Sequence, residues 1–182
     1  MTIHLVTDRK IDSAILETVL GREIDRDGLQ IHFTGTRSGA ASKARTILVV
    51  RKEPVILVLE CDDRTLGEEQ QWHEGQLNRG GPRELWRVLL VVPTLDVCFF
   101  DHPEFVEGLF EAKLSEVDKM LARFRPREVI EKLFLSKGMP YTPESIANFL
   151  GDKDLSLLRE SYPFRDIRKA IQEIQATVAQ AV

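Results

Sequence analysis

Apolar and polar positions along the first hundred residues predict strands separated by helices. Residues 55–59 are continuously apolar, as expected of a strand buried on both faces of a parallel sheet. Residues 11–19 carry apolar side chains at helical spacing, with Asp12 expected as the N-cap and Gly21 as the stop. The other expected elements are strands at 3–7, 29–34 and 85–92, a loop at 35–39, and helices at 40–51 and 64–76. This alternation predicts an α/β fold with a mainly parallel four-stranded sheet flanked by helices.

The pattern changes after Asp101, where every remaining apolar stretch has helical spacing. The expected helices are 104–110, 114–124, 126–137, 142–150 and 167–181. We therefore expect an α/β domain at 1–103 and an all-helical C-terminal extension at 104–182 packed on it. A chain of 182 residues is long enough for such a domain with one appendage.

Composition and charge narrow the class of protein. No apolar run approaches the roughly 20 residues of a membrane span, and Asp8 interrupts the segment where a signal peptide would be apolar. Cys61 and Cys98 show no zinc-ligand spacing and suit a reducing compartment. We expect a soluble, cytoplasmic protein. The net charge of -4 argues against a dedicated nucleic-acid coat but permits a local basic face.

Acidic residues follow three of the expected strands. Asp8 ends the first strand, Glu60 and Asp62 end the third, and Asp96 follows the fourth. Ligands of open parallel sheets bind at the carboxyl ends of the strands, and hard divalent cations prefer oxygen ligands. A metal site is one interpretation. The other is that these residues lie in exposed loops or cap helices, where acidic residues are common.

Three segments resemble the Toprim-like domains of the overcoming-lysogenization-defect (OLD) family nucleases and their small stand-alone relatives. They are LVTDRKIDSAILETVL, GTRSGAASKARTILVVRKEPVILVLECDDRT and VVPTLDVCFF, within residues 1–105. The resemblance implies that Asp8 takes the family's first acidic position, that Glu60 and Asp62 take its Asp-x-Asp pair, and that Asp96 takes a later one. The family has Glu where this chain has Asp8, and Asp where it has Glu60. The resemblance therefore implies a metal site more directly than it implies turnover.

The resemblance also implies an activity, which is hydrolysis of nucleic-acid phosphodiester bonds with Mg²⁺ (or Mn²⁺). Asp8, Glu60 and Asp62 are then the expected catalytic residues, and these three with Asp96 the expected metal ligands. Arg37, Lys43 and Arg64 are the expected phosphate-positioning residues, with the backbone N–H groups of residues 38–41 as a further anion site. The implied partners are nucleic acid, DNA before RNA, a separate ATPase subunit in phage defence, and a second copy of the chain; no membrane contact is expected.

Other functions remain open at this level. One alternative is a catalytically degenerate Toprim-like interaction protein. Trp72 is a candidate partner surface, and the basic RFRPRE stretch at 123–128 is either a solvated helix face or a contact for a nucleic-acid backbone. Another is a receiver-like phosphotransfer domain, although no Lys follows the strand at 85–92. The GTRSGAASKA segment lacks the spacing of a nucleotide-binding P-loop, because Lys43 lies four residues after Gly39.

Overall fold

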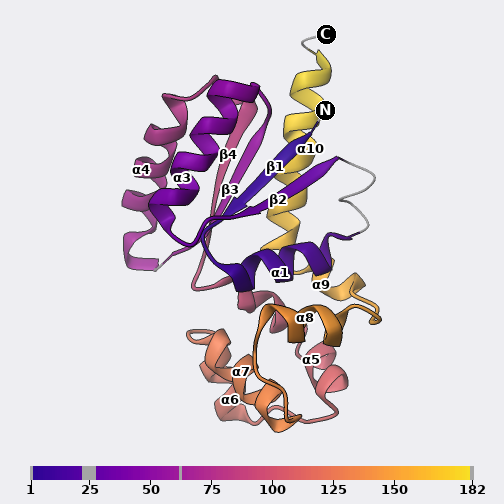
Figure 1. The fold of residues 1–182 in the computed structure, drawn as a ribbon. Coiled ribbons are helices and arrows are strands. Elements are labelled where there is room, and N and C mark those ends of the chain that lie inside the picture. Colours follow the sequence, from indigo (N-terminus) through magenta and orange to yellow (C-terminus); the bar gives the residue numbers. More distant parts are fainter. Residues whose placement is uncertain (1, 22–27, 62, 181–182) are drawn as a thin grey trace.

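The computed structural model describes residues 2–21, 28–61 and 63–180, and it contains a four-stranded, entirely parallel sheet (Figure 1). The strands are β1 (Ile3–Thr7), β2 (Leu29–Phe33), β3 (Val55–Glu60) and β4 (Trp86–Val91). Their order across the sheet is β2-β1-β3-β4. Helices flank the sheet, so the predicted α/β class is confirmed.

Strands β1 and β3 are neighbours, with Leu5 paired to Ile56 and Val6 to Leu57. The chain leaves β1 toward β2 on one side and returns to β3 on the other. The connections therefore diverge between β1 and β3, which is where open α/β sheets leave a crevice at the carboxyl ends of their strands. This topology places the residues that follow β1 and β3 side by side.

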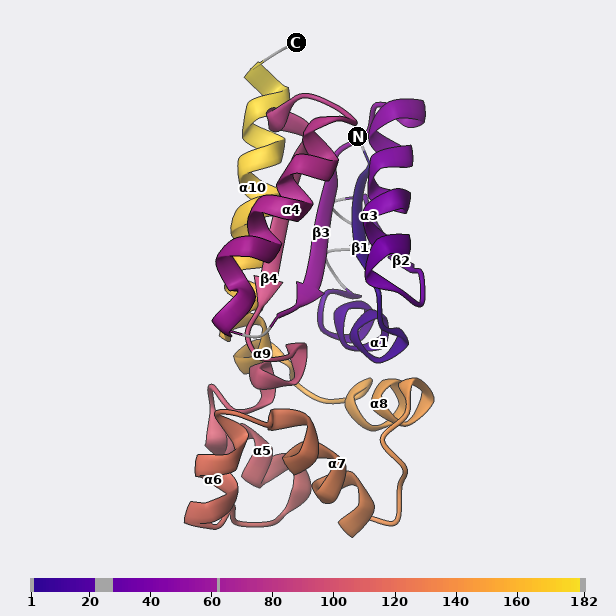
Figure 2. The same ribbon diagram turned by 90° about the vertical axis from the view of Figure 1, so that its left-hand side faces the viewer.

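One face of the sheet is covered by α3 (Arg37–Thr46), its π-helical continuation η1 (Ile47–Arg51) and α4 (Leu66–Asn78) (Figure 2). Their apolar side chains form a core with Val6, Leu57 and Leu59. The expected loop at 35–39 is wrong, because α3 already begins at Arg37. The Thr36 hydroxyl accepts a hydrogen bond from the Gly39 N–H at 3.0 Å, and this cap starts the helix three residues early.

The opposite face is covered by α1 (Lys10–Val19) and α10 (Phe164–Gln180). Arg9 is the N-cap of α1, so the predicted capping role of Asp12 is wrong. Asp12 lies inside the first turn of α1 and is buried. Its side chain contacts Arg127, described below, rather than the end of the helix. The sequence also predicts a turn at residues 25–28, of which 25–27 lie outside the described residues.

Short helices lie beyond the carboxyl end of the sheet, at the bottom of Figures 1 and 2. They are η4 (Leu95–Phe99), α5 (Pro103–Phe110), α6 (Glu116–Ala122), α7 (Pro126–Ser136), α8 (Pro143–Leu150) and α9 (Ser156–Glu160). The sequence pattern predicted neither η4 nor α9. Two further 3-10 turns, η2 (Asp63–Thr65) and η3 (Arg83–Leu85), flank α4.

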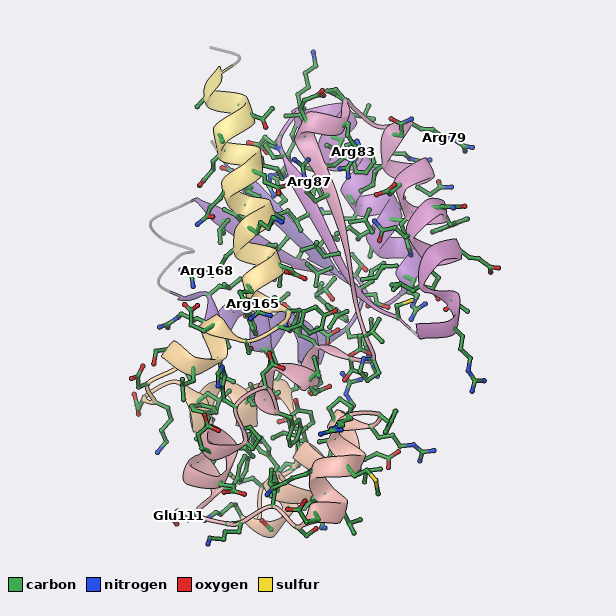
Figure 3. The ribbon with its side chains drawn as sticks, turned by 180° about the vertical axis from the view of Figure 1, so that it is seen from behind. Arg79, Arg83, Arg87, Glu111, Arg165 and Arg168 are labelled. Atoms are coloured by element: carbon green, nitrogen blue, oxygen red, sulfur yellow. The ribbon has the colours of Figure 1, made fainter. Side chains whose placement is uncertain are left out.

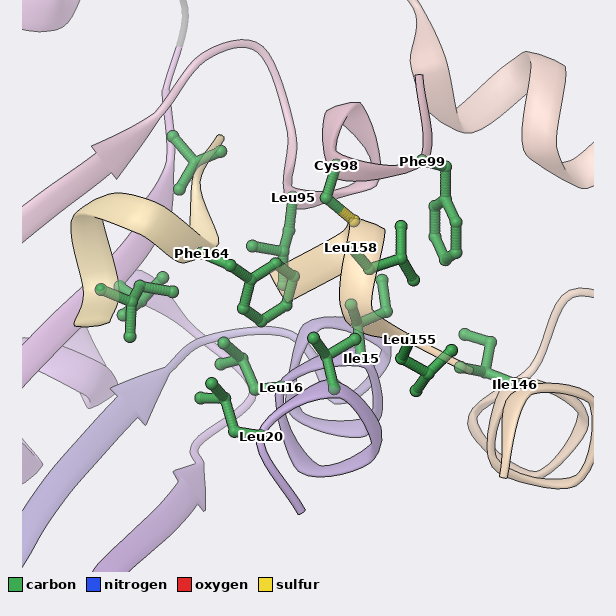
Figure 4. Packing of buried hydrophobic residues seen from close by; sticks show 14 of the residues in the cluster. Ile15, Leu16, Leu20, Leu95, Cys98, Phe99, Ile146, Leu155, Leu158 and Phe164 are labelled. Atoms are coloured by element: carbon green, nitrogen blue, oxygen red, sulfur yellow. The ribbon is translucent and has the colours of Figure 1, made fainter. Parts of the chain in front are cut away.

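A continuous hydrophobic core joins these helices to the sheet. Figure 4 shows α1, η4, α8, α9 and α10 contributing side chains to it, among them Ile15, Leu95 and Ile146. Two ion pairs connect α10 to neighbouring elements. Arg87 of β4 contacts Glu173 of α10 at 3.1 Å, and Arg168 of α10 contacts Glu160 of α9 at 3.0 Å; both arginines are labelled in Figure 3. Within the described part of the chain, no helix is both long enough and apolar enough to cross a membrane.

Candidate functional site

Four acidic side chains lie at the carboxyl end of the sheet. Asp8 directly follows β1 and Glu60 is the last residue of β3. Asp96 lies in η4, the 3-10 helix after β4, and Asp12 comes from the first turn of α1. Glu60 is 7% exposed, Asp12 2% and Asp96 not at all. We call Asp12, Glu60 and Asp96 the acidic cluster.

A guanidinium group from the helical extension enters the acidic cluster. Arg127, the second residue of α7, places its Nη2 atom 2.5 Å from Glu60 Oε1 and 2.7 Å from Asp96 Oδ2. The same nitrogen lies 3.3 Å from Asp12 Oδ1. The side chain of Arg127 is only 16% exposed, so the three carboxylates and the cation are removed from water together.

Two more arginines border the cluster. The Arg9 guanidinium donates a hydrogen bond to Glu60 Oε2. Arg37, at the start of α3, donates to the Glu60 carbonyl oxygen at 2.7 Å and to Glu69 Oε2 at 2.6 Å, and its Nε lies 3.9 Å from Asp8 Oδ2. Glu60 is therefore held by cations from two sides.

Asp96 is fixed by hydrogen bonds as well as by charge. The Thr94 hydroxyl donates to Asp96 Oδ2 at 3.0 Å, and the Tyr141 hydroxyl donates to Asp96 Oδ1. Burial, and then the negative charge of Asp96, raise the pKa of Tyr141 well above its ordinary value. The phenol of Tyr141 therefore remains protonated and donates to Asp96. The 3-10 helix after β4 places Asp96 at the carboxyl end of the sheet, as the sequence predicted.

The electrostatics of the cluster oppose ionisation of Asp12 and favour a permanent cation at Arg127. Burial, followed by the charges of Glu60 and Asp96, raises the pKa of Asp12 to about 8, although Arg127 and Arg9 oppose this shift. Burial acts to lower the pKa of Arg127, but the carboxylates of Asp96, Glu60 and Asp12 outweigh it and raise that pKa. Asp12 therefore holds a proton more readily in this network than an exposed aspartate does.

Some buried polar atoms beside the cluster have no hydrogen-bond partner among the described residues. They include Thr7 Oγ1, Asp8 Oδ1 and Arg127 Nε. A buried polar atom without a partner costs on the order of 1–3 kcal/mol, and such atoms often meet a water, an ion or a substrate. Among them, Asp8 Oδ1 is the carboxylate oxygen, and the other oxygen of Asp8 lies 3.9 Å from Arg37 Nε.

The chemistry of the side chains at this edge suits a metal ion, whereas their arrangement does not. Carboxylate oxygens are the ligands that Mg²⁺ prefers. Yet no group of three or more His, Cys, Asp or Glu side chains within residues 2–21, 28–61 and 63–180 is arranged to hold an ion. Glu60 and Asp96 direct oxygens at Arg127, whereas Asp8 Oδ1 has no hydrogen-bond partner among the described residues.

The structure gathers some of the predicted site residues and separates others. Asp8, Glu60, Asp96 and Arg37 lie together, whereas Asp62 lies outside the described residues. Lys43 is exposed in the second turn of α3, and its charge acts on His32 rather than on the cluster. Arg64 is exposed in η2. The N–H groups of Gly39 and Ala40 already donate to Thr36, which leaves less of the predicted anion site at residues 38–41.

The sequence analysis missed Asp12 and Tyr141 as members of the site, and it considered Arg127 only within the basic stretch at 123–128. Asp12 carried a usable signal, since it lies in the first turn of the helix that directly follows the carboxyl end of β1. Arg127 and Tyr141 carried no signal that placed them at this site, because they are 115 and 129 residues from Asp12 along the chain.

No protein-family model matches the chain, and neither the curated proteins nor the solved structures include a significant match to it.

Proposed function

We propose that this protein is a Mg²⁺-dependent nuclease, or the nuclease-like subunit of a larger assembly, acting on nucleic-acid phosphodiester bonds. One observation carries the proposal: acidic side chains that follow β1, β3 and β4 meet at the crevice between the ends of β1 and β3. That crevice is the usual ligand site of such sheets. The resemblance to the OLD family nucleases extends the proposal to a separate ATPase subunit and to phage defence.

Asp8, Glu60, Asp62 and Asp96 are the residues that would hold the metal. A bound Mg²⁺ would supply neutralisation of phosphate charge and an activated water. Arg37, with its side chain 44% exposed, would orient the phosphate beside Asp8. Because Arg127 already contacts oxygens of Glu60 and Asp96, it competes with a cation for them.

A second function is favoured by the same guanidinium group. Arg127 neutralises the cluster from within the chain, as a residue would if the metal site had been lost. The protein would then be a catalytically degenerate interaction protein. Metal binding separates the two functions, because in the second one Arg127 permanently takes the place of the cation.

The test is a titration with Mn²⁺ and Mg²⁺, followed by calorimetry and by thermal unfolding. For the nuclease, millimolar metal should raise the melting temperature of the wild type, and Asp62→Asn should abolish this rise. Asp152→Asn is the matched control, because Asp152 is an exposed carboxylate after α8 and should leave metal binding unchanged. Arg127→Gln should bind metal more tightly than the wild type.

Metal binding that Asp62→Asn abolishes would lead to cleavage assays on plasmid DNA, single-stranded DNA and RNA. Absence of binding to both the wild type and Arg127→Gln at millimolar metal would overturn the nuclease proposal. The interaction protein would then be the remaining function, and its partner should be captured with the wild-type chain.

A further inference from the structure

A pocket of about 570 Å³ opens between the start of α3 and the outer side of α4. It is lined by Arg37, Ser38, Glu68, Glu69, Trp72 and His73. Arg37 belongs both to this pocket and to the acidic edge, since it contacts the Glu60 carbonyl oxygen and lies near Asp8. The pocket is therefore adjacent to the proposed catalytic edge and has the size of a small-ligand site.

Trp72 gives the pocket a flat aromatic surface. Its side chain is 51% exposed, whereas His73 beside it is 2% exposed. The two rings meet edge to face, with centroids 4.7 Å apart and planes at 87°. His73 thus fixes the orientation of the indole from one side and leaves a large part of Trp72 open to a ligand.

The groups in the pocket that can receive a phosphate lie at the start of α3, opposite the carboxylates Glu68 and Glu69, of which Glu69 accepts a hydrogen bond from Arg37 at 2.6 Å. The first backbone N–H groups of α3, at Arg37 and Ser38, have no acceptor within the helix, and a helix N-terminus favours negative charge. The Arg37 guanidinium is partly exposed next to them. Behind Trp72, the buried His73 Nδ1 has no hydrogen-bond partner among the described residues, although His73 belongs to the lining of the pocket.

We propose that this pocket binds one unstacked base of a single-stranded nucleic acid, with the base lying on Trp72 and its phosphate near Arg37 and the start of α3. The next phosphodiester bond would then lie beside Asp8. The inference rests on the proposed function for its substrate class, and it specifies single-stranded over duplex nucleic acid. Bases within a duplex are stacked on their neighbours and cannot present a face to Trp72.

Tryptophan fluorescence tests the inference directly, because Trp86 is buried under α3 and α4 and Trp72 is the exposed indole. Short single-stranded DNA should quench the wild-type fluorescence in the presence of a chelator. Affinity measured by anisotropy should fall about 10-fold in Trp72→Ala and recover in Trp72→Phe, since stacking needs an aromatic face. Leu135→Ala removes an exposed apolar side chain of α7, outside the residues that line the pocket, and should bind as the wild type does.

Three further ligands are compared with the single strand: a duplex, an oligonucleotide of abasic sites and free mononucleotides. A duplex of the same sequence and an oligonucleotide of abasic sites should bind at least several-fold more weakly than the single strand. Equal binding of the abasic oligonucleotide, or equal binding by Trp72→Ala, would overturn the inference. So would quenching by free mononucleotides with no binding of oligonucleotides.

Failure of the proposed function gives a different pattern. Oligonucleotide binding lost in Trp72→Ala, without metal binding or cleavage, would retain the base pocket and reject the nuclease. Metal-dependent cleavage that Trp72→Ala leaves unchanged would retain the nuclease and reject the base pocket.

Discussion

Arg127 places one guanidinium group among three buried carboxylates, and its contribution to stability differs from that of an ordinary surface cation. Removing one partner of a buried ion pair leaves charge that neither water nor protein compensates. The carboxylate of Asp96 would be left in this way if the side chain of Arg127 became neutral, whereas Glu60 would keep its contact with Arg9. The helical extension therefore stabilises the acidic edge of the sheet through the charge of Arg127, beside the hydrogen bond from Tyr141.

The first prediction concerns Arg127→Gln. We expect the free energy of unfolding to fall by about 3 kcal/mol or more, the usual consequence of breaking a buried pair. Urea unfolding measures it. Arg125→Gln is the control two residues away, where the side chain is 65% exposed and pairs with Glu128, and it should cost less than about 1 kcal/mol. Equal effects of the two substitutions would show that the cluster gains nothing from Arg127.

A second buried network lies near the amino-terminal half of β1. The fully buried His4 contacts His32 Nε2 through its Nδ1 and Glu53 Oε2 through its Nε2, both at 2.8 Å. Burial lowers the pKa of His32 below its ordinary 6.5, and the positive charges of His4, Lys43 and Arg51 lower it further. His32 thus takes up a proton less readily in the folded chain than in the unfolded one.

The second prediction follows from that difference. Below about pH 6.5 the unfolded chain binds a proton that folded His32 resists, so the free energy of unfolding should decrease as the pH falls. His32→Gln retains an N–H donor for His4 but cannot titrate. Between about pH 7 and pH 5 the variant should lose less stability than the wild type in urea unfolding. Parallel pH profiles for the two proteins would contradict the assignment.

At the scale of elements, the start of α3 decides where several functional groups lie. The Thr36 cap sets Arg37 as the first helical residue and so directs it toward Asp8 and Glu69. Gly39 is required beside this cap, because a Cβ there would lie 2.8 Å from Thr36 Oγ1. The cap, the glycine and Arg37 form one local unit within GTRSG.

The third prediction concerns this cap. Thr36→Ala removes the acceptor for the Gly39 N–H and should lower the free energy of unfolding by about 1 kcal/mol. Thr36→Ser keeps a hydroxyl oxygen and should retain most of that stability. Chemical unfolding monitored by circular dichroism measures both variants. A serine variant as unstable as the alanine variant would indicate that the methyl group, rather than the hydrogen bond, stabilises this end of α3.

At the scale of the whole molecule, the extension and the α/β part share one core. Phe110, Phe134, Phe149 and Tyr141 form an aromatic group in the extension, with ring centroids 5.0–5.3 Å apart. These residues belong to or pack against the same cluster that contains Ile56 and Val58 of β3. A continuous core of this kind favours unfolding as one unit.

The fourth prediction tests that continuity. Phe134→Ala should lower the free energy of unfolding by about 3–5 kcal/mol, as for other buried aromatic residues. In a Trp72→Phe background, Trp86 fluorescence reports β4 and circular dichroism reports the helices, and both should show one midpoint that shifts together. Phe124→Ala, at an exposed position, should shift neither probe. A Trp86 midpoint that stayed constant would show that the two parts unfold independently.

The strands and most helices were predictable because their signals are local. Residues 55–59 are apolar in sequence and buried in the sheet, and the helix starts at Pro103, Pro126 and Pro143 follow from proline at the first helical position. The short elements η4 and α9 were not predicted, because five residues carry too little periodicity. The first turn of α3 was not predicted, because its cap lies within GTRSG, a segment typical of loops.

The sequence by itself determined the parallel α/β class and the presence of acidic residues at the ends of strands, because the alternation of buried strands and helices follows from local apolar patterns. Only the tertiary structure decided what those residues contact. Arg127 and Tyr141 reach Glu60 and Asp96 across a large separation in the chain, through the packing of α7 against η4. Such contacts depend on the folded positions of whole elements, and no local pattern encodes them.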